Sequence, residues 1–297
     1  MSNIAVIGAG KWGSALHFAL SQKQICYITN RTKKDIKNFI PLKEAILCEY
    51  LVIAIPSQYI RDWLKDYFVF KGQKVLVASK GIEAKSGAFL QEIYEEFIPK
   101  ENLGFISGPS FATEVKQSLP TALVINSASE NFYNDFSSFF PDFIKTYYSD
   151  DIVGAEIAGA YKNVLAIASG IAQGLKLGEN ARASLISRGL VEMARFGEYY
   201  GAKNETFLGL SGAGDLFLTA SSTLSRNFRV GLGLAKNKNL ETILQELNEV
   251  AEGVMTSYAI YKLSKEHNIY TPIADEVKFI LDGKDPKESL KDLLNKR

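Results

Sequence analysis

The chain has 297 residues, of which 46% are hydrophobic and 23% are charged, and its formal net charge at pH 7 is +1. This length leaves room for two domains, and the composition is typical of a soluble globular protein. The balanced charge gives no electrostatic reason to expect binding to nucleic acid or to an anionic membrane. No apolar run approaches the roughly 20 residues that span a bilayer.

Metal and disulfide chemistry are disfavoured by the residue counts. The chain has two cysteines, Cys26 and Cys48, and two histidines, His17 and His267. These are too few for a disulfide framework, a zinc site or a histidine-based metal site. The N-terminus enters an apolar strand at once and lacks the layout of a signal peptide. We therefore expect a metal-free cytoplasmic protein.

The first half of the chain alternates short apolar runs with helix-like stretches. The runs are continuous rather than alternating, which is typical of strands buried on both faces of a parallel sheet. The stretches between them, such as 11–22 and 86–97, are long enough for crossover helices. The predicted strands are IAVIG (4–8), ICYIT (25–29), LVIAI (51–55), KVLVA (74–78), GFIS (104–107) and TALVI (121–125).

A glycine motif follows the first predicted strand. Gly8, Gly10 and Gly13 form G-x-G-x-x-G at the opening of a helix. The first glycine permits a tight turn, the second lets a pyrophosphate approach the backbone, and the third packs helix on strand. Glycines at a plain strand-to-helix turn are the alternative. Their place in the first strand–helix–strand unit of an alternating sheet favours a dinucleotide site.

Polar groups also follow the later strands, where ligands of such sheets bind. Ser79 and Lys80 follow the fourth predicted strand, and Gly108, Ser110 and Ala112 follow the fifth. Lys80 by itself could be an ordinary surface lysine. Its position at a strand end that faces a cofactor crevice makes an active-site role equally plausible.

From about residue 152 the strand signal ends. The fold class is therefore α/β: a Rossmann-type, doubly wound, mainly parallel sheet domain that binds NAD(P) over residues 1–152, followed by an all-helical substrate-binding and catalytic domain over 153–297. The predicted helices run roughly over 153–176, 180–201, 212–222, 226–236, 239–248, 253–267, 272–281 and 286–295.

The first of these helices carries one cation on a face of small residues. Steps of three and four place Ala155, Gly159, Lys162, Ala166 and Gly170 on one stripe. Small neighbours would let ligands come close to the helix. An ammonium group there could protonate, or stabilise, an oxygen that gains negative charge during hydride transfer.

The motifs together resemble bacterial NAD(P)-dependent glycerol-3-phosphate dehydrogenase. They follow the family's order and span residues 8–254. The matching segments are GAGKWG, IAIPSQYIR, ASKGIE, SGPSFATEV, AYKNVLAIASGI, GLSGAGDLFLTASSTLSRNFRVG and VAEGV. Lys11 stands where relatives commonly carry a small residue and Thr32 where many have histidine, and the chain is somewhat shorter than typical relatives near 32–50.

The resemblance implies reversible reduction of dihydroxyacetone phosphate to sn-glycerol 3-phosphate, the backbone donor for phospholipids. It implies NADP(H) or NAD(H) as cofactor and a cytoplasmic homodimer. The implied catalytic residues are Lys162, Lys80 and Asp215. The implied cofactor contacts are Gly8, Gly10, Lys11, Trp12, Gly13, Arg31, Lys80, Ala112, Arg226, Val250 and Glu252. The implied substrate contacts are Lys80, Gly108, Ser110, Lys162, Asp215, Ser225, Arg226 and Asn227.

Residue chemistry supports several of these roles and leaves alternatives. Asp215 would orient Lys162, although a helix cap is its other reading. The planar fork of Arg226 and the neutral donor of Asn227 suit a phosphate dianion, although a solvated basic turn is the commoner use of such a pair. A carboxylate partner raises the pKa of a lysine, whereas desolvation and a second lysine lower it.

The predicted second strand ends in Asn30 and Arg31 rather than in a carboxylate. An acidic residue at this position takes both ribose hydroxyls and repels a 2′-phosphate. Arg31 can pair with that phosphate, and Lys33 and Lys34 add positive potential nearby. We therefore expect NADPH to be used at least as well as NADH.

Two other interpretations remain open. One is a related dehydrogenase of the same plan that acts on another keto acid or sugar phosphate. The other is a catalytically silent dinucleotide-binding redox sensor. The segments SGPSFATEV and SRN argue against the first, and the intact trio Lys80, Lys162 and Asp215 argues against the second.

Overall fold

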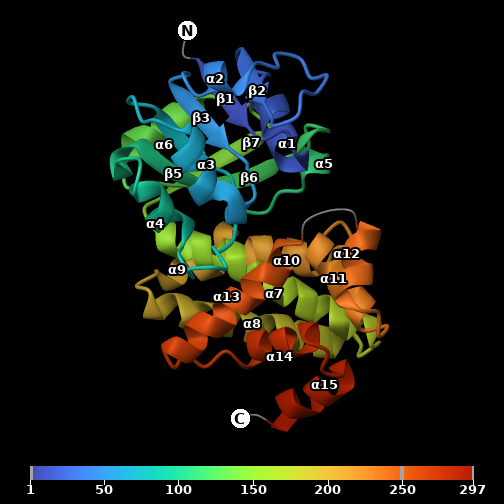
Figure 1. The fold of residues 1–297 in the computed structure, drawn as a ribbon. Coiled ribbons are helices and arrows are strands. Elements are labelled where there is room, and N and C mark those ends of the chain that lie inside the picture. Colours follow the sequence, from blue (N-terminus) through green and yellow to red (C-terminus); the bar gives the residue numbers. More distant parts are fainter. Residues whose placement is uncertain (1–2, 248–250, 296–297) are drawn as a thin grey trace. The chain divides into compact units, whose positions relative to one another are not determined.

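The computed structural model describes residues 3–247 and 251–295, which form two compact units (Figure 1). The first unit contains Met1–Lys80 and Leu90–Ala155, and the second contains Gly81–Phe89 and Glu156–Arg297. The division therefore falls a few residues after the predicted 152/153 boundary. The segment after the fourth strand also groups with the helices, because the Phe89 ring lies 5.0 Å from that of Tyr200.

The first unit is built on a seven-stranded sheet in the order β2-β1-β3-β4-β5-β6-β7. All predicted strands are present, with bounds that differ by one or two residues. The strands are β1 (Ile4–Ile7), β2 (Cys26–Thr29), β3 (Tyr50–Ile53), β4 (Lys74–Val77), β5 (Leu103–Ser107), β6 (Thr121–Asn126) and β7 (Ile144–Ser149).

The sequence did not predict the strand β7 or the antiparallel direction of β6. β7 has alternate exposed residues, so its sequence IKTYYS lacks the continuous apolar run of a strand buried on both faces. β6 pairs antiparallel with β5, whereas the other neighbouring strands pair parallel. Asn126 fixes that antiparallel pair, because its Nδ2 donates to the Phe105 carbonyl and to Ser107 Oγ, both at 2.9 Å.

Helices cover both faces of this sheet. On one face, α1 (Lys11–Leu20) and α6 (Glu130–Ser138) pack on Ile4, Val6 and the residues level with them in the neighbouring strands. Gly104 permits the close approach of α6, because a Cβ there would lie 2.2 Å from the Phe132 ring. On the other face, the Tyr94 ring of α4 (Leu90–Glu95) lies 6.3 Å from that of Phe105. α4 is shorter than the helix predicted over 86–97.

The remaining elements of the first unit are short. α2 (Leu42–Ala45), α3 (Ile60–Tyr67) and α5 (Ala112–Val115) are α-helical, and Ser57–Tyr59 and Lys100–Asn102 form single 3₁₀ turns. α2 is a single turn, so most of the connection from β2 to β3 is irregular. Part of that connection runs beside β2, where Ile28 bridges to Phe39.

The second unit is helical, and α7 runs through its middle (Figure 1). Nearly every residue of α7 is buried. No helix in the described part of the chain combines the length and apolar character needed to cross a membrane. The helices are α7 (Ile152–Gly174), α8 (Glu179–Tyr199), α9 (Asn204–Leu208), α10 (Asp215–Ala220), α11 (Arg226–Leu234), α12 (Leu240–Leu247), α13 (Glu252–Glu266), α14 (Pro272–Leu281) and α15 (Pro286–Asn295).

Glycines allow a close helix crossing in this unit. A Cβ on Gly170 of α7 would lie 2.1 Å from the Phe228 carbonyl oxygen, and one on Gly231 of α11 would lie 2.1 Å from the Ile167 carbonyl oxygen. The backbones of α7 and α11 therefore touch, which no larger residue would permit. This crossing brings the N-terminus of α11 beside the turn of α7 that carries Lys162 and Asn163.

Candidate functional site

The glycine motif follows β1, the strand at which the order of the strands in the sheet reverses. β1 lies between β2 and β3, so its two connections lead to opposite sides, and this is where doubly wound sheets bind ligands. Gly8 has φ +105°, and a Cβ there would lie 2.5 Å from the Ala54 carbonyl oxygen. A Cβ on Gly13 would lie 1.9 Å from the Gly8 carbonyl oxygen. The protein itself therefore requires both of these glycines.

Gly10 is different. It has φ −73°, which any residue can adopt, and apart from its two chain neighbours no residue has an atom within 4 Å of the position of an added Cβ. It is exposed and immediately precedes α1. The fold therefore gives no reason for a glycine here, whereas the close approach of a phosphate to the start of the helix does. This observation fits a dinucleotide.

The residues after β2 hold the glycine loop. The Ala9 amide donates to Asn30 Oδ1 at 3.2 Å, and Lys34 Nζ donates to the Ala9 carbonyl at 2.6 Å. Asn30 therefore occupies the place of the missing carboxylate and uses its oxygen on the loop. Lys34 is also part of the loop's support, a role that its sequence position did not reveal.

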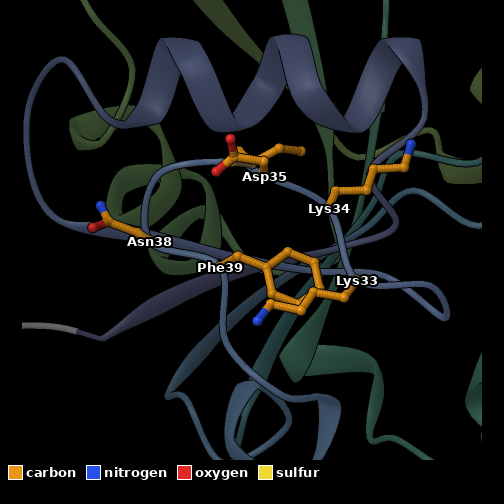
Figure 2. A pocket seen from close by; sticks show the side chains of 6 residues that line it. Lys33, Lys34, Asp35, Asn38 and Phe39 are labelled. Atoms are coloured by element: carbon orange, nitrogen blue, oxygen red, sulfur yellow. The ribbon is translucent and has the colours of Figure 1, made fainter.

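An open hollow of about 610 Å³ adjoins this segment, and Figure 2 shows the side chains that line it. The ammonium groups of Lys33 and Lys34 point in different directions (Figure 2). Arg31 and Lys33 are exposed and make no hydrogen bond or ion pair within the described residues. The lining residues are Lys33, Lys34, Asp35, Ile36, Asn38 and Phe39.

The other predicted residues of the first unit lie at strand ends. Gly108 follows β5 with φ +107°, and the Ser110 hydroxyl donates to its carbonyl at 3.3 Å. Ala112 is the first residue of α5, which packs beside α1. Lys80 is half-buried after β4. Lys11 and Trp12 open α1, the first exposed and the second half-buried.

Lys162 and Asp215 meet in the interior of the second unit. Lys162 Nζ donates to Asp215 Oδ1 at 2.5 Å and to Thr219 Oγ1 at 3.0 Å. The residues are 8%, 1% and 6% exposed, so water screens this ion pair little. The sequence did not identify Thr219, although its spacing of four from Asp215 places both on one face of α10.

Asp215 is brought to this position by an unusual turn. Leu210–Gly214 form a π-helical turn, and Asp215 is the first residue of α10 after it. A Cβ on Gly212 would lie 2.2 Å from the Phe207 carbonyl oxygen, so this turn needs a glycine. π-Helical turns are frequent at functional sites. The Asp215 carboxylate contacts Lys162 and Thr219, and α10 begins after Gly214, so the helix-cap interpretation is wrong.

The start of α11 holds the predicted phosphate contacts. Ser225 caps the helix by accepting from the Phe228 amide at 3.3 Å, and Arg226 is half-buried. Asn227 Nδ2 donates to Asn163 Oδ1 at 2.9 Å, and its Oδ1 accepts from the Gly253 amide at 3.0 Å. Asn163, which the sequence analysis did not single out, thus joins α7 to α11.

The remaining predictions concern the small face of α7 and the start of α13. The small face of α7 was expected to admit ligands, but at Gly170 it is filled by α11. Glu252 is the half-buried first residue of α13. Val250 lies outside the described residues. The neighbouring amide of Gly253 is bonded to Asn227, so the start of α13 is joined to the start of α11.

Comparison with known proteins identifies the family. The family model described as NAD-dependent glycerol-3-phosphate dehydrogenase N-terminus matches residues 27–133, and that for the C-terminus matches 151–291. The NAD(P)+ glycerol-3-phosphate dehydrogenase of Sulfurimonas denitrificans is 64% identical and covers 99% of this chain and all of its own. That of Campylobacter jejuni subsp. doylei is 63% identical over 98% of each chain.

A solved structure agrees in fold over the whole chain. The crystal structure of glycerol-3-phosphate dehydrogenase from Coxiella burnetii matches with a TM-score of 0.91, at 32% identity and over 99% of each chain. The sequence match and the structural match thus cover both units. The resemblance inferred from the motifs is confirmed: the chain belongs to the NAD-dependent glycerol-3-phosphate dehydrogenase family.

Proposed function

We propose that this protein catalyses the reversible, NAD(P)H-dependent reduction of dihydroxyacetone phosphate to sn-glycerol 3-phosphate. The observation that carries the proposal is the buried ion pair of Lys162 and Asp215, supported by Thr219. A purely structural protein gains little from a buried ion pair, because desolvation of the charges offsets their attraction. An oxidoreductase that creates an alkoxide needs a charge of this kind.

The dinucleotide fits the glycine motif of the first unit. Gly8 and Gly13 form the turn, Gly10 leaves the start of α1 open, and the positive end of that helix attracts phosphate. When bound, the dinucleotide supplies or accepts the hydride. Family membership makes NADP(H) and NAD(H) the two candidates, and we propose that NADPH is used at least as well as NADH.

Lys162 acts on the oxygen of the reacting carbon. As hydride reaches C2 of the ketone, negative charge develops on the C2 oxygen, and the ammonium group of Lys162 donates a proton to it. In the reverse direction the neutral amine removes that proton. Asp215 and Thr219 hold Nζ in one position, so Lys162 does not have to be ordered during the reaction.

The phosphate of the substrate is assigned to the start of α11. Arg226 supplies the planar cation, and the positive end of the helix adds to the local potential. Asn227 has its carbonyl oxygen and one amide hydrogen engaged by Gly253 and Asn163. The second amide hydrogen remains to bind an anion, and Asn163 fixes its direction.

The other assignments rest on the resemblance. Lys80, Gly108 and Ser110 are proposed to contact the substrate, and Lys80 to assist Lys162. Lys11, Trp12, Arg31, Ala112, Val250 and Glu252 are proposed as cofactor contacts. We further propose a cytoplasmic homodimer that supplies the glycerol backbone for phospholipids.

One assay tests the activity directly. The purified protein is given dihydroxyacetone phosphate with NADPH or NADH, and oxidation of the cofactor is followed at 340 nm. Formation of sn-glycerol 3-phosphate supports the proposal. Turnover only with another keto acid or sugar phosphate would assign a different substrate. Dinucleotide binding with no turnover of any of these compounds would favour a redox sensor.

A further inference from the structure

A buried carboxylate outside the proposed reaction joins three helices of the second unit. Glu192 of α8 is 2% exposed. Its Oε1 accepts from the Tyr161 hydroxyl at 2.8 Å and from the Ala274 amide at 2.9 Å, and its Oε2 accepts from the Ile273 amide at 2.8 Å. α7, α8 and α14 therefore meet at one carboxyl group.

Two of these three hydrogen bonds cap the start of α14. Ile273 and Ala274 follow Pro272 at the start of α14, where amides lack partners within the helix. A carboxylate there satisfies both amides and interacts favourably with the helix dipole. The bond from Tyr161 adds nothing to that cap. It extends the contact to α7, at the residue before Lys162.

Tyr161 is held on the α8 side of its helix by several contacts. It is completely buried, and its ring lies 5.5 Å from that of Phe196. One turn along, a Cβ on Gly189 of α8 would lie 2.7 Å from Leu165 Cδ2, so the two helices are in close contact there. The Tyr161–Glu192 bond is a buried polar contact of this crossing, so it opposes rotation or sliding of this turn of α7 against α8.

Lys162 faces another helix. Successive residues of an α-helix point about 100° apart, so Tyr161 is bonded to α8 while Lys162 reaches Asp215 and Thr219 of α10. A rotation of this turn would move Nζ relative to α10 and to the substrate. A misplacement of about 1 Å can reduce a rate about a hundredfold.

We infer that Glu192 is a positioning residue for the reaction: through the hydroxyl of Tyr161 it holds the turn of α7 that presents Lys162 to the substrate. The inference rests on the proposed role of Lys162 as acid and base. It assigns to Glu192 and Tyr161 no contact with substrate or cofactor.

The pKa shifts of Tyr161 and Glu192 are consistent with this role. Burial and then the negative charge of Glu192 raise the pKa of Tyr161 well above its usual value, so its hydroxyl keeps the proton that it donates. Burial raises the pKa of Glu192 to about 7, while the amide and hydroxyl donors act in the opposite direction. The other charged groups that act on the pair are Asp275 of α14 and Arg195 of α8.

The test is Tyr161→Phe, which removes one hydroxyl and keeps the buried ring. The control is Tyr258→Phe, which removes a bond of 2.9 Å from α13 to Asp282, the residue that follows α14. We expect Tyr161→Phe to lower kcat about tenfold or more, with KM for dihydroxyacetone phosphate and the dinucleotide Kd changed less than about twofold. Tyr258→Phe should leave all three values unchanged. A kcat within about twofold of wild type for Tyr161→Phe would overturn the inference.

Variants of Glu192 complete the test. Glu192→Gln keeps a carbonyl oxygen for Tyr161 and should retain more activity than Glu192→Ala. The double variant Tyr161→Phe with Glu192→Gln should lose no more kcat than Tyr161→Phe alone, because both changes act through one bond. Multiplied losses would overturn the inference, as would a loss confined to KM.

Lys162→Ala separates this inference from the proposed function. If Lys162→Ala keeps normal turnover, the proposed mechanism fails, whatever Tyr161→Phe does. If Lys162→Ala is inactive and Tyr161→Phe has wild-type kcat, the positioning role alone fails. Should Glu192→Ala not fold, the comparison of the two Tyr→Phe variants still decides.

Discussion

Lys162 and Asp215 are 53 positions apart in the sequence, yet Nζ and Oδ1 lie 2.5 Å apart in the interior of the helical unit. Both side chains are more than nine-tenths buried. Thr219 bonds to both, so the ammonium group has two fixed partners. Loss of either partner would therefore affect the chemistry of the site and, by leaving an unpaired buried charge, would also destabilise the second unit.

Replacing Lys162 by alanine should lower kcat by roughly 10²–10⁴-fold, because acid–base assistance is typically worth that much. Dinucleotide binding, measured by fluorescence titration, should be retained. Removal of one partner from a buried ion pair should also destabilise the protein, by about 3–5 kcal/mol. The kinetics should therefore be measured well below the Tm of the variant. Near-normal turnover would move the acid–base role elsewhere, with Lys80 next in line.

Gly10→Ala and Gly13→Ala should separate binding from folding. Gly10→Ala should weaken dinucleotide binding by about tenfold or more and leave Tm nearly unchanged, because a Cβ there meets no protein atom. Gly13→Ala should lower the stability by at least about 1–3 kcal/mol, because its Cβ would collide with the Gly8 carbonyl. Calorimetry and binding titrations check both. A Gly10→Ala variant that binds as tightly as wild type would contradict the assignment of the motif.

Arg226→Ala should raise KM for dihydroxyacetone phosphate steeply, because truncating one member of a desolvated charge pair costs about 2–5 kcal/mol. Unphosphorylated dihydroxyacetone lacks the group that Arg226 is proposed to hold, so its turnover should change much less. Steady-state kinetics with both substrates make the comparison. Equal losses would show that Arg226 is not the phosphate clamp, or that it acts mainly through the cofactor.

Arg31→Ala should reduce kcat/KM more with NADPH than with NADH, because a planar cation can pair with the 2′-phosphate. Lys43→Ala is the control, since it removes an exposed cation from α2, in the same connection between β2 and β3. The wild-type protein should use NADPH at least as well as NADH. A clear wild-type preference for NADH would refute this expectation, as would equal losses with both cofactors.

Glu192 should make the stability of the protein depend on pH. Its folded-state pKa of about 7 lies above the ordinary value of 4.5, so the native state binds more protons between these values. The contribution of Glu192 is therefore fully present below about pH 4.5 and is lost as the pH rises through about 7. It amounts to about 3 kcal/mol.

Urea unfolding of wild type and Glu192→Gln at pH 5 and pH 8 measures this effect. The wild type should lose stability relative to the variant as the pH rises. Glu101→Gln, at an exposed carboxylate, should show no such trend. The difference in unfolding free energy between wild type and Glu192→Gln should therefore depend on pH. A difference that is independent of pH, or that favours the wild type more at pH 8, would argue against a raised pKa of Glu192 in the folded protein.

The sequence alone predicted the fold class, the family and most elements. These features depend on local patterns: continuous apolar runs for β1 to β6, a period of 3.6 for the long helices, and glycines where a turn leaves no room for a Cβ. Elements without such patterns were missed. β7 alternates like a half-exposed strand, and the π-helical turn before Asp215 has no distinctive composition.

Tertiary structure decided which distant residues meet. No local pattern couples Lys162 to Thr219, Asn227 to Asn163 or Tyr161 to Glu192, because each pair is joined by the crossing of two helices. The crossing of α7 and α11 also reversed one expectation, since the small residue Gly170 makes room for α11 rather than for a ligand. The residue types of the site could be predicted from the sequence because few side chains can protonate an alkoxide or bind a phosphate. Their partners were not, because helix packing decides which side chains come within hydrogen-bond distance.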